Sequence, residues 1–412
     1  PLVHQPAGYL GYAQGIKQKL SIPVIAVGRI EPEEGDAAIA SGKADFVAMG
    51  RKLLADPDLP TRLRQGRPDD IRPCIYCYTC VSRIFVNDHV RCAVNPATGF
   101  EYETVVSPAE KPRKLLVVGG GPAGMEAARI AAQRGHQVRL AEQARSLGGT
   151  AFFASVVYPE NGRLVDYLKQ QIAGSSVELD LGVKVDESYL DSFRPDAVIV
   201  ATGARRDAPD IPGVDQDNVF SGDEMRGLMT GHGAESARSK LAFWQRWALS
   251  LAGSLGITRN AALLARLSHV WMPLGKQVCI VGGGLVGAEL AEFLALRGRK
   301  VSLIEESGKF AVELPLVRRW RLLEELKQLS VVMINHTRLL RVSGRQLAID
   351  CQGSEVEIEA DTVILASGAC GDLSLAERAR EMGYETHVAG DCDGVGYLEG
   401  AMRSAHQVAT AL

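Results

Sequence analysis

The sequence lacks the features that hold a protein on a membrane or on a nucleic acid. Its 46 Lys and Arg residues are balanced by 49 Asp and Glu residues, so the net charge of −3 gives no attraction to a polyanion. The most apolar region, 241–272, is interrupted by Arg246, Arg259 and Arg266, which leaves no run long enough to span a bilayer. We therefore expect neither a nucleic acid nor a membrane as partner, and a cytoplasmic location.

Cysteine is scarce over most of the chain. Of the eight cysteines, four are gathered in one segment, and these are Cys74, Cys77, Cys80 and Cys92. Two residues separate each of the first three, so their sulfur atoms can meet on one tight loop, and the last can supply a fourth ligand. Four thiolates suit an iron–sulfur cluster. Structural zinc is the alternative, although zinc sites usually show two separated cysteine pairs. Disulfides would require an oxidising compartment, which nothing else in the sequence suggests.

Residues 1–72 are predicted to form two strand–helix units. The short apolar runs 23–28 and 45–50 indicate buried parallel strands, and a helix is expected between them over 32–41. Two such units cannot close a barrel of about 250 residues and would leave an open sheet edge. We therefore expect the sequence to be part of a longer chain.

Both of these strands end in glycine followed by arginine, at Gly28, Arg29, Gly50 and Arg51. Backbone N–H groups and guanidinium groups together suit a bound phosphate. The loops after the last two strands of a (β/α)₈ barrel often form such a site. The alternative is that both arginines are surface or ion-pair residues.

A dinucleotide-binding pattern begins at Lys114, after a proline-containing linker at 101–113. An apolar strand leads into Gly119, Gly121 and Gly124, which hold the G-x-G-x-x-G spacing. The first glycine allows a tight turn, the second lets the backbone approach a pyrophosphate, and the third lets the helix pack closely. The next strand, 137–142, ends in Glu142, whose carboxylate is placed to accept ribose hydroxyls.

The same pattern returns further along the chain. Gly282, Gly284 and Gly287 repeat the spacing, and the following strand, 300–305, ends in Glu305. An acid at this position favours the free 2′-hydroxyl of NADH, because the 2′-phosphate of NADPH would require an arginine. NADPH stays the alternative, since a nearby arginine could offset the acid.

The remaining segments complete two nested units. The strands 196–203 and 361–368 are similar to each other, and the chain ends in a strand leading to Asp391, followed by a helix at about 398–411. Between the two glycine patterns, 223–275 is predicted as two or three helices. This Arg-rich region, which contains tryptophans at 244, 247 and 271, is expected to pack rather than to carry chemistry.

In this order the elements resemble a known family of NADH:flavin oxidoreductases, which includes 2,4-dienoyl-CoA reductase, enoate reductase and trimethylamine dehydrogenase. The resemblance covers nearly the whole chain. It implies an α/β fold class with a partial (β/α)₈ barrel remnant, an iron–sulfur cysteine segment and two nested Rossmann-like domains of the glutathione-reductase type. The domains that we predict are 1–72, the C-terminal end of an FMN-binding TIM barrel; 73–113, the iron–sulfur segment and linker; 114–222, the first part of the FAD domain; 223–275, the helical insertion; 276–359, the NAD(P) domain; and 360–412, the second part of the FAD domain.

The resemblance also assigns the cofactors. It implies FMN phosphate at Gly28, Arg29, Gly50 and Arg51, a [4Fe–4S] cluster on Cys74, Cys77, Cys80 and Cys92, FAD at Gly119, Gly121, Gly124, Glu142 and Asp391, and NADH at Gly282, Gly284, Gly287 and Glu305. The two-residue gap between Cys77 and Cys80 follows the trimethylamine type of spacing. In the family, the carboxylate matched by Asp391 bonds the ribityl chain.

Two departures limit what the resemblance implies. The family's proton donors toward the substrate lie on earlier barrel strands that this sequence does not contain, so the catalytic residues are unknown, and His4 is expected to be a solvated loop residue. No redox cysteine pair stands near 147–150, which argues against the disulfide-reductase branch.

Together these patterns predict an iron–sulfur flavoprotein oxidoreductase. NADH would reduce FAD, and electrons would pass through the cluster to FMN, where an activated C=C bond of a small substrate is reduced. One alternative is an amine-dehydrogenase-like enzyme with outward electron flow to an electron-transfer partner. A second is a diaphorase subunit whose partner supplies the barrel, and a third is a non-catalytic nucleotide-binding remnant. A homo-oligomer is compatible with each of them.

Overall fold

The computed structural model describes residues 5–206, 209–230, 239–241, 243–254, 258 and 260–412. The chain forms two compact units, Pro1–Tyr76 and Cys77–Leu412. The predictions made for His4 and Arg259 lie outside the described residues. None of the helices in the described ranges combines the length and apolar character needed to cross a bilayer.

The first unit contains the predicted strand–helix–strand. The strands β1 (Ile25–Val27) and β2 (Phe46–Ala48) pair in parallel and are connected by α2 (Pro32–Ala40). The flanking helices are α1 (Leu10–Lys17), α3 (Gly50–Ala55), α4 (Leu59–Arg64) and the 3₁₀ helix η1 (Pro68–Asp70).

One face of this small sheet is apolar and exposed. Ala26 is buried in the core of the unit, whereas Ile25 and Val27 on the opposite face are 62% and 59% exposed. Phe46 on the neighbouring strand is 57% exposed. Because successive strand residues point to opposite faces, the sheet presents a continuous apolar surface on one side.

The second unit begins at Cys77, within the cysteine segment. It contains α5 (Thr79–Phe85) and continues into a five-stranded parallel sheet. The strand order is β17-β6-β3-β4-β5, and the strands are β3 (Lys114–Val118), β4 (Gln137–Glu142), β5 (Glu178–Leu181), β6 (Ala197–Val200) and β17 (Glu385–Val388). Buried strand residues fill its core, among them Leu116 and Val198.

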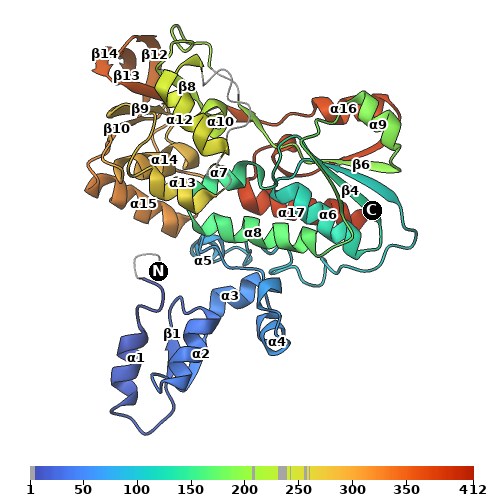
Figure 1. Ribbon diagram of the computed structural model, residues 1–412. Coiled ribbons are helices and arrows are strands. Elements are labelled where there is room, and N and C mark those ends of the chain that lie inside the picture. The colour runs from blue at the N-terminus through green and yellow to red at the C-terminus, as the bar shows by residue number, and fades with distance from the viewer. Residues whose placement is uncertain (1–4, 207–208, 231–238, 242, 255–257, 259) are drawn as a thin grey trace. The chain divides into compact units, whose positions relative to one another are not determined.

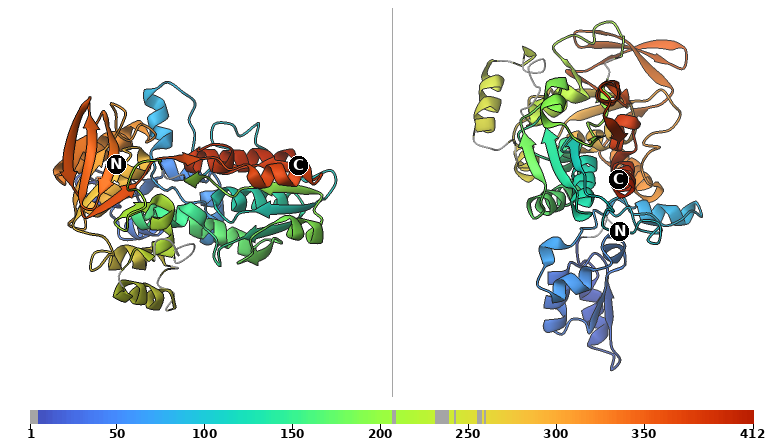
Figure 2. Two further views of the ribbon diagram at one scale, coloured as in Figure 1. Left: turned by 90° about the horizontal axis from the view of Figure 1, so that it is seen from above. Right: turned by 90° about the vertical axis from the view of Figure 1, so that its right-hand side faces the viewer.

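Helices cover both faces of this first large sheet. One face carries α6 (Pro122–Gln133), α8 (Glu160–Ala173) and α17 (Tyr397–Ala411), and the other carries α9 (Glu187–Phe193) and α16 (Ser374–Glu381) (Figure 1). Figure 2 shows that α17, the last helix of the chain, runs along the sheet, although most of the sheet is formed by much earlier residues. The C-terminus therefore completes the domain that begins at β3.

A second five-stranded parallel sheet has the order β11-β10-β9-β15-β8. Its strands are β8 (Val219–Ser221), β9 (Gln277–Val281), β10 (Lys300–Ile304), β11 (Val332–Ile334) and β15 (Thr362–Leu365), with α14 (Leu285–Ala295) and α15 (Leu316–Gln328) beside them (Figure 1). An antiparallel sheet of β12 (Thr337–Ser343), β13 (Gln346–Cys351) and β14 (Ser354–Glu359) follows β11. A short pair of β7 (Arg205–Arg206) and β16 (Ala369–Cys370) lies where the chain passes between the two domains.

The sheet topology corrects two of the predicted domain boundaries. The boundary after residue 222 is late, because β8 belongs to the second sheet, and the boundary at residue 360 is early, because β15 pairs with β9 in that sheet. The reason is that β15 repeats the role of β6, which pairs with β3 in the first sheet. The rest of the predicted division stays a prediction.

The segment 223–275 contains α10 (Gly222–Thr230), α12 (Phe243–Ser254) and α13 (Ala261–Leu267). The rings of Trp244 and Trp271 lie 5.6 Å apart. However, Trp244 and Trp247 are 57% and 63% exposed. The interpretation of this region as helices that pack rather than carry chemistry stays a prediction.

Candidate functional site

The first glycine loop has no room for a side chain at its first and third glycines, where the spacing predicts a tight turn and close packing of the helix. A Cβ on Gly124 would lie 1.8 Å from the carbonyl oxygen of Gly119, and a Cβ on Gly119 would lie 2.3 Å from that of Ala201. A Cβ on Gly121, in contrast, would meet nothing within 4 Å. The loop thus has a tight turn, a closely packed helix and open space at the start of α6. These are the properties that a bound pyrophosphate requires.

Glu142 holds this loop from the end of β4. Its carboxylate is buried and accepts hydrogen bonds from the N–H of Gly120 at 2.6 Å and from the N–H of Ala144 at 2.7 Å. Both oxygens of the carboxylate therefore have fixed positions beside the glycine turn. An acid at this strand end is the residue that binds ribose hydroxyls in dinucleotide folds. The residues present fit the adenosine end of FAD.

The second glycine loop repeats the close packing of the third glycine and the two hydrogen bonds of the acid. A Cβ on Gly287 would lie 1.9 Å from the carbonyl oxygen of Gly282. Glu305 accepts from the N–H of Gly283 at 2.6 Å and from the N–H of Ser307 at 2.8 Å. The stretches 119–150 and 282–313 correspond position for position without an insertion. The second loop therefore fits the adenosine end of a second dinucleotide.

Asp391 lies beside the first loop. It is part of the 3₁₀ helix η3 (Gly390–Asp393), and a Cβ on Gly390 would lie 2.7 Å from that of Ala123 at the start of α6. The carboxylate of Asp391 accepts a hydrogen bond from the N–H of Gly396 at 2.9 Å. Burial raises the pKa of Asp391, while the N–H groups at the start of α17 act in the opposite direction. The structure thus brings Asp391 to the glycine loop of the same domain.

The four predicted cluster ligands are divided between the two units. Cys74 belongs to the first unit, and Cys77, Cys80 and Cys92 belong to the second. Cys74 is buried and the other three are partly exposed. Among the residues that the structure describes, no group of three or more His, Cys, Asp or Glu side chains is arranged to hold a metal ion. The cluster therefore stays a prediction from the cysteine spacing.

The backbone around Cys77 is nevertheless unusual. Tyr76 and Tyr78, on either side of it, have φ values of 52° and 68° in the left-handed region. Bulky side chains rarely adopt this conformation, which costs of order 1–3 kcal/mol and is found where a loop clamps a ligand. Two such residues turn the chain sharply at Cys77. This turn fits a segment that wraps a compact cluster.

The arginines predicted to bind phosphate come together in the first unit. Gly28 and Arg29 form a left-handed turn after β1, with φ values of 127° and 50°. The guanidinium carbons of Arg29 and Arg51 lie 4.2 and 5.1 Å from the ring centroid of Tyr76. At Gly50, a Cβ would meet nothing within 4 Å. Two guanidinium groups against one ring beside open backbone fit a bound phosphate.

A buried charge cluster was not predicted from the sequence. Arg318 on α15 is buried and pairs with Glu292 at 3.0 Å, with Glu325 at 3.4 Å and with Glu289 at 4.0 Å. Burial raises the pKa of Glu292 to about 7 against the opposing charge of Arg318. The only available signal was the spacing of Glu289 and Glu292, which places two acids on neighbouring positions of α14.

This cluster lies next to the cysteine segment. The guanidinium of Arg318 is 5.4 Å from the ring of Tyr158, whose pKa is raised by burial first and then, among other charges, by Cys77. The hydroxyl of Ser82 on α5 accepts from the N–H of Val317 at 3.4 Å. The helix that follows the cysteines thus contacts the second nucleotide-binding domain directly.

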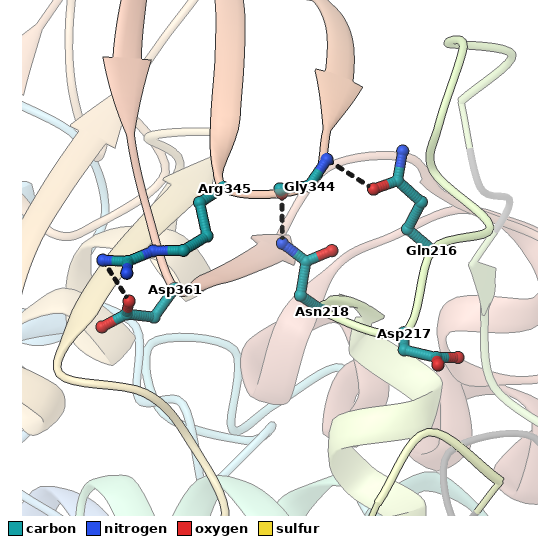
Figure 3. A pocket seen from close by; sticks show the side chains of 6 residues that line it. All are labelled: Gln216, Asp217, Asn218, Gly344, Arg345 and Asp361. Atoms are coloured by element: carbon teal, nitrogen blue, oxygen red, sulfur yellow. Dashed lines mark hydrogen bonds and ion pairs between the residues drawn. The ribbon is translucent and has the colours of Figure 1, made fainter.

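One surface pocket lies away from both glycine loops, at the turn between β12 and β13 (Figure 3). Its polar side chains bind one another and the backbone: Gln216 accepts from the N–H of Gly344 and Asn218 donates to its carbonyl oxygen, both at 2.7 Å. Arg345 pairs with Asp361 at 2.7 Å. These bonds attach the antiparallel sheet to the parallel one, so we assign the pocket a structural role.

Comparison with known families agrees with this geometry. The family model described as pyridine nucleotide-disulphide oxidoreductase matches residues 113–393, and the model of the NADH:flavin oxidoreductase / NADH oxidase family matches residues 5–70. The chain is similar to an NADH oxidase from Thermoanaerobacter brockii, with 34% identity over 406 residues, 96% of this chain and 56% of that protein. It is also similar to a cinnamate reductase from Clostridium sporogenes, with 31% identity over 417 residues, 99% of this chain and 56% of that protein.

A solved structure of 2-naphthoyl-CoA reductase in complex with 2-naphthoyl-CoA has a TM-score of 0.84 and 26% identity, covering 99% of this chain and 57% of that one. The chain thus spans a little more than half the length of the relatives it matches. These matches agree with a mixed α/β chain that has the FAD- and NAD-binding architecture.

Proposed function

The chain belongs to the pyridine nucleotide-disulphide oxidoreductase family. We propose that it is an NADH-dependent flavin enzyme of the enoate and dienoyl-CoA reductase type, and that it carries electrons from NADH to an activated C=C bond. The proposed order is NADH, FAD, a [4Fe–4S] cluster and FMN. The observation that carries this proposal is the pair of glycine loops in register, each held by an acid that accepts the same two backbone N–H bonds.

The chain's own residues would bind and orient the two nucleotides. The N-termini of α6 and α14 would present backbone N–H groups to a pyrophosphate. Glu142 and Glu305 would accept hydrogen bonds from ribose hydroxyls, and Asp391 would bond the ribityl chain of FAD. Bound FAD would supply the hydride-accepting chemistry. The acid at Glu305 supports NADH over NADPH.

Residues 1–72 are proposed to be the end of an FMN-binding barrel. The match of residues 5–70 to the NADH:flavin oxidoreductase family supports this proposal. So does the exposed apolar face of β1 and β2, because barrel strands point one face at a packed interior that further strands must close. Arg29 and Arg51 would hold the FMN phosphate. The remaining strands would come from further residues of a longer chain or from a partner subunit.

The four cysteines are proposed to hold the cluster. A two-electron donor and a second flavin need a relay that moves electrons one at a time, and an iron–sulfur cluster is such a relay. The strained turn at Cys77 supports the proposal. The names of two relatives, a cinnamate reductase and a 2-naphthoyl-CoA reductase, support an unsaturated acid or thioester as the substrate class.

Replacing Cys80 by serine is expected to remove most of the bound iron, because a neutral hydroxyl is a much weaker ligand for iron than a thiolate. Iron and acid-labile sulfide per chain are measured after anaerobic purification, with flavin content as an internal reference. Cys351 on β13 lies outside the segment and serves as the matched control, so Cys351→Ser should leave the iron content unchanged. Equal iron in wild type and Cys80→Ser would rule out Cys80 as a ligand.

An anaerobic titration with NADH tests the proposed function as a whole. We expect the visible absorbance of the flavin to bleach first and the broad iron–sulfur absorbance to fade afterwards. A chain that carries flavin which NADH does not reduce would contradict the proposal. Outward flow from an amine is the second candidate, favoured by the Cys77–Cys80 spacing. It predicts that an amine, and not NADH, bleaches the flavin.

A further inference from the structure

Among the differences between the two glycine loops, one concerns an exposed residue close to the start of the helix. Thr150 follows the first loop, and Glu313 stands at the corresponding place after the second. A carboxylate oxygen of Glu313 accepts a hydrogen bond from the N–H of Leu285, the first residue of α14, at 2.9 Å. Its other oxygen would lie 3.0 Å from a Cβ on Gly284. Glu313 therefore covers the start of α14.

The path of the backbone explains why this position reaches the helix. The N–H of Ala311 donates to the carbonyl oxygen of Gly283 at 2.7 Å, and Ala311 has a left-handed φ of 52°. In the first loop, the N–H of Gly148 makes the same bond to Gly120 at 2.8 Å. Both loops thus follow one course, and the side chain two residues later lies at the nucleotide-binding helix.

The environment of the two helix starts is nevertheless opposite in charge. In the first loop, Gly149 begins α7 (Gly149–Val157) and approaches Gly121 so closely that a Cβ would lie 3.0 Å from its Cα. Two helix N-termini therefore meet there, which favours an anion. In the second loop, the start of α14 meets the carboxylate of Glu313 instead. Glu313 therefore places a negative charge at the helix start where a pyrophosphate would bind, whereas the matching residue of α6, Pro122, has no N–H and makes no such contact.

We propose that Glu313 sets the affinity for the nicotinamide nucleotide, and weakens its binding, by placing a carboxylate at the N-terminus of α14, where the pyrophosphate would dock. The proposal rests on the proposed function, since it concerns the same site. Glu313 is exposed, so its side chain can turn outward when a nucleotide arrives. NADH and NAD⁺ share the pyrophosphate, so Glu313 lowers the affinity for both and speeds the release of the oxidised product.

A second observation places Glu313 on the side of the loop that faces the flavin domain. The pKa of Tyr397, the first residue of α17, is raised to about 12 by burial first and then by the charges of Glu313 and Asp391. One tyrosine is thus close to the carboxylate proposed to bind FAD and to the one that covers the second loop.

The test compares Glu313→Gln with wild type as flavin-loaded full chains. Binding of NADH, ADP-ribose and adenosine is measured by isothermal titration calorimetry at low and moderate salt. We expect NADH and ADP-ribose, which carry the pyrophosphate, to bind 3- to 10-fold more tightly to the variant, with adenosine unchanged. Glu324→Gln, an exposed acid on α15, removes the same charge elsewhere and should leave all three affinities unchanged.

Unchanged or weaker NADH binding by Glu313→Gln, together with the same result for Glu313→Ala, would overturn the proposal. So would an equal gain for adenosine, which would show a general charge effect. Wild-type protein that binds no nucleotide at all would contradict the proposed function itself and remove this inference with it. Thermal unfolding of each variant confirms that the compared proteins are folded.

Discussion

Replacing Gly124 by alanine is expected to weaken flavin binding. Inside a helix this change alone would stabilise the protein by about 1 kcal/mol, because alanine is the better helix former. Here the added Cβ would lie 1.8 Å from the carbonyl oxygen of Gly119, a backbone atom that cannot move without opening the loop. The steric cost of overpacking, typically about 1–3 kcal/mol or more, exceeds the gain in helix propensity. The resulting distortion affects the loop that would bind the pyrophosphate. We expect a decrease of about 10-fold or more in FAD affinity, where about 10-fold corresponds to about 1.4 kcal/mol.

The measurement is the flavin absorbance per chain after purification and after incubation with excess FAD. Gly287→Ala is the matched variant, because its Cβ would lie 1.9 Å from the carbonyl oxygen of Gly282 in the second loop. It should retain flavin and lose reduction by NADH. Gly11→Ala, in a helix where a Cβ meets nothing within 4 Å, should change neither. A Gly124→Ala protein that holds FAD as firmly as wild type would contradict the assignment of the first loop.

Replacing Arg318 by alanine is expected to destabilise the protein much more than replacing an exposed arginine does. Arg318 is 7% exposed and pairs with carboxylates from two helices. Removing one partner of a buried ion pair costs about 3–5 kcal/mol, because the remaining charges stay buried without compensation. The loss is measured as the change in the free energy of unfolding of the second unit in a denaturant titration. Arg321→Ala is the matched control on the same helix, since its pair with Glu325 is partly exposed and worth about 1 kcal/mol or less.

The loss should depend on pH in a defined direction. The pKa of Glu292 is raised by burial to about 7, so the folded protein holds this proton more firmly than the unfolded chain does. The stability that protonated Glu292 contributes is therefore fully present below about pH 4.5, the pKa of this group in the unfolded chain. This stability is lost as the pH rises through about 7, its pKa in the folded protein. At pH 6 the Glu292 carboxyl is largely neutral, so losing the positive charge of Arg318 leaves less uncompensated negative charge in the interior. Arg318→Ala should thus lose more stability at pH 8 than at pH 6, and an equal loss at both would contradict the pairing.

The Arg318 cluster also has a place in the proposed electron path. It connects α14 and α15 of the nicotinamide domain with Tyr158, whose pKa is influenced by Cys77. The helix after Cys80 contacts α15 through Ser82 and Val317. A variant that disturbs this cluster therefore disturbs the elements between the second nucleotide site and the cysteine segment.

The sequence alone determined the parts of this protein that depend on short-range spacing. Three glycines at fixed intervals between an apolar strand and a helix specify a nucleotide loop. In the first loop, backbone contacts require Gly119 and Gly124, and Gly121 leaves open space at the start of the helix. The acids Glu142 and Glu305 were predictable for the same reason: a strand of fixed length places them beside the loop. The four cysteines predict a cluster by spacing, and that prediction does not depend on the rest of the fold.

The tertiary structure decided what depends on residues far apart in the chain. It assigned β8 and β15 to the second sheet, because strand pairing is set by neighbours on both sides and not by the order of segments. It joined Arg318 to acids on another helix, and it placed Glu313 over the start of α14. Neither residue belongs to a local pattern, since each acts on a partner more than twenty residues away. Long-range packing brings such groups together, and no spacing rule in the sequence encodes it.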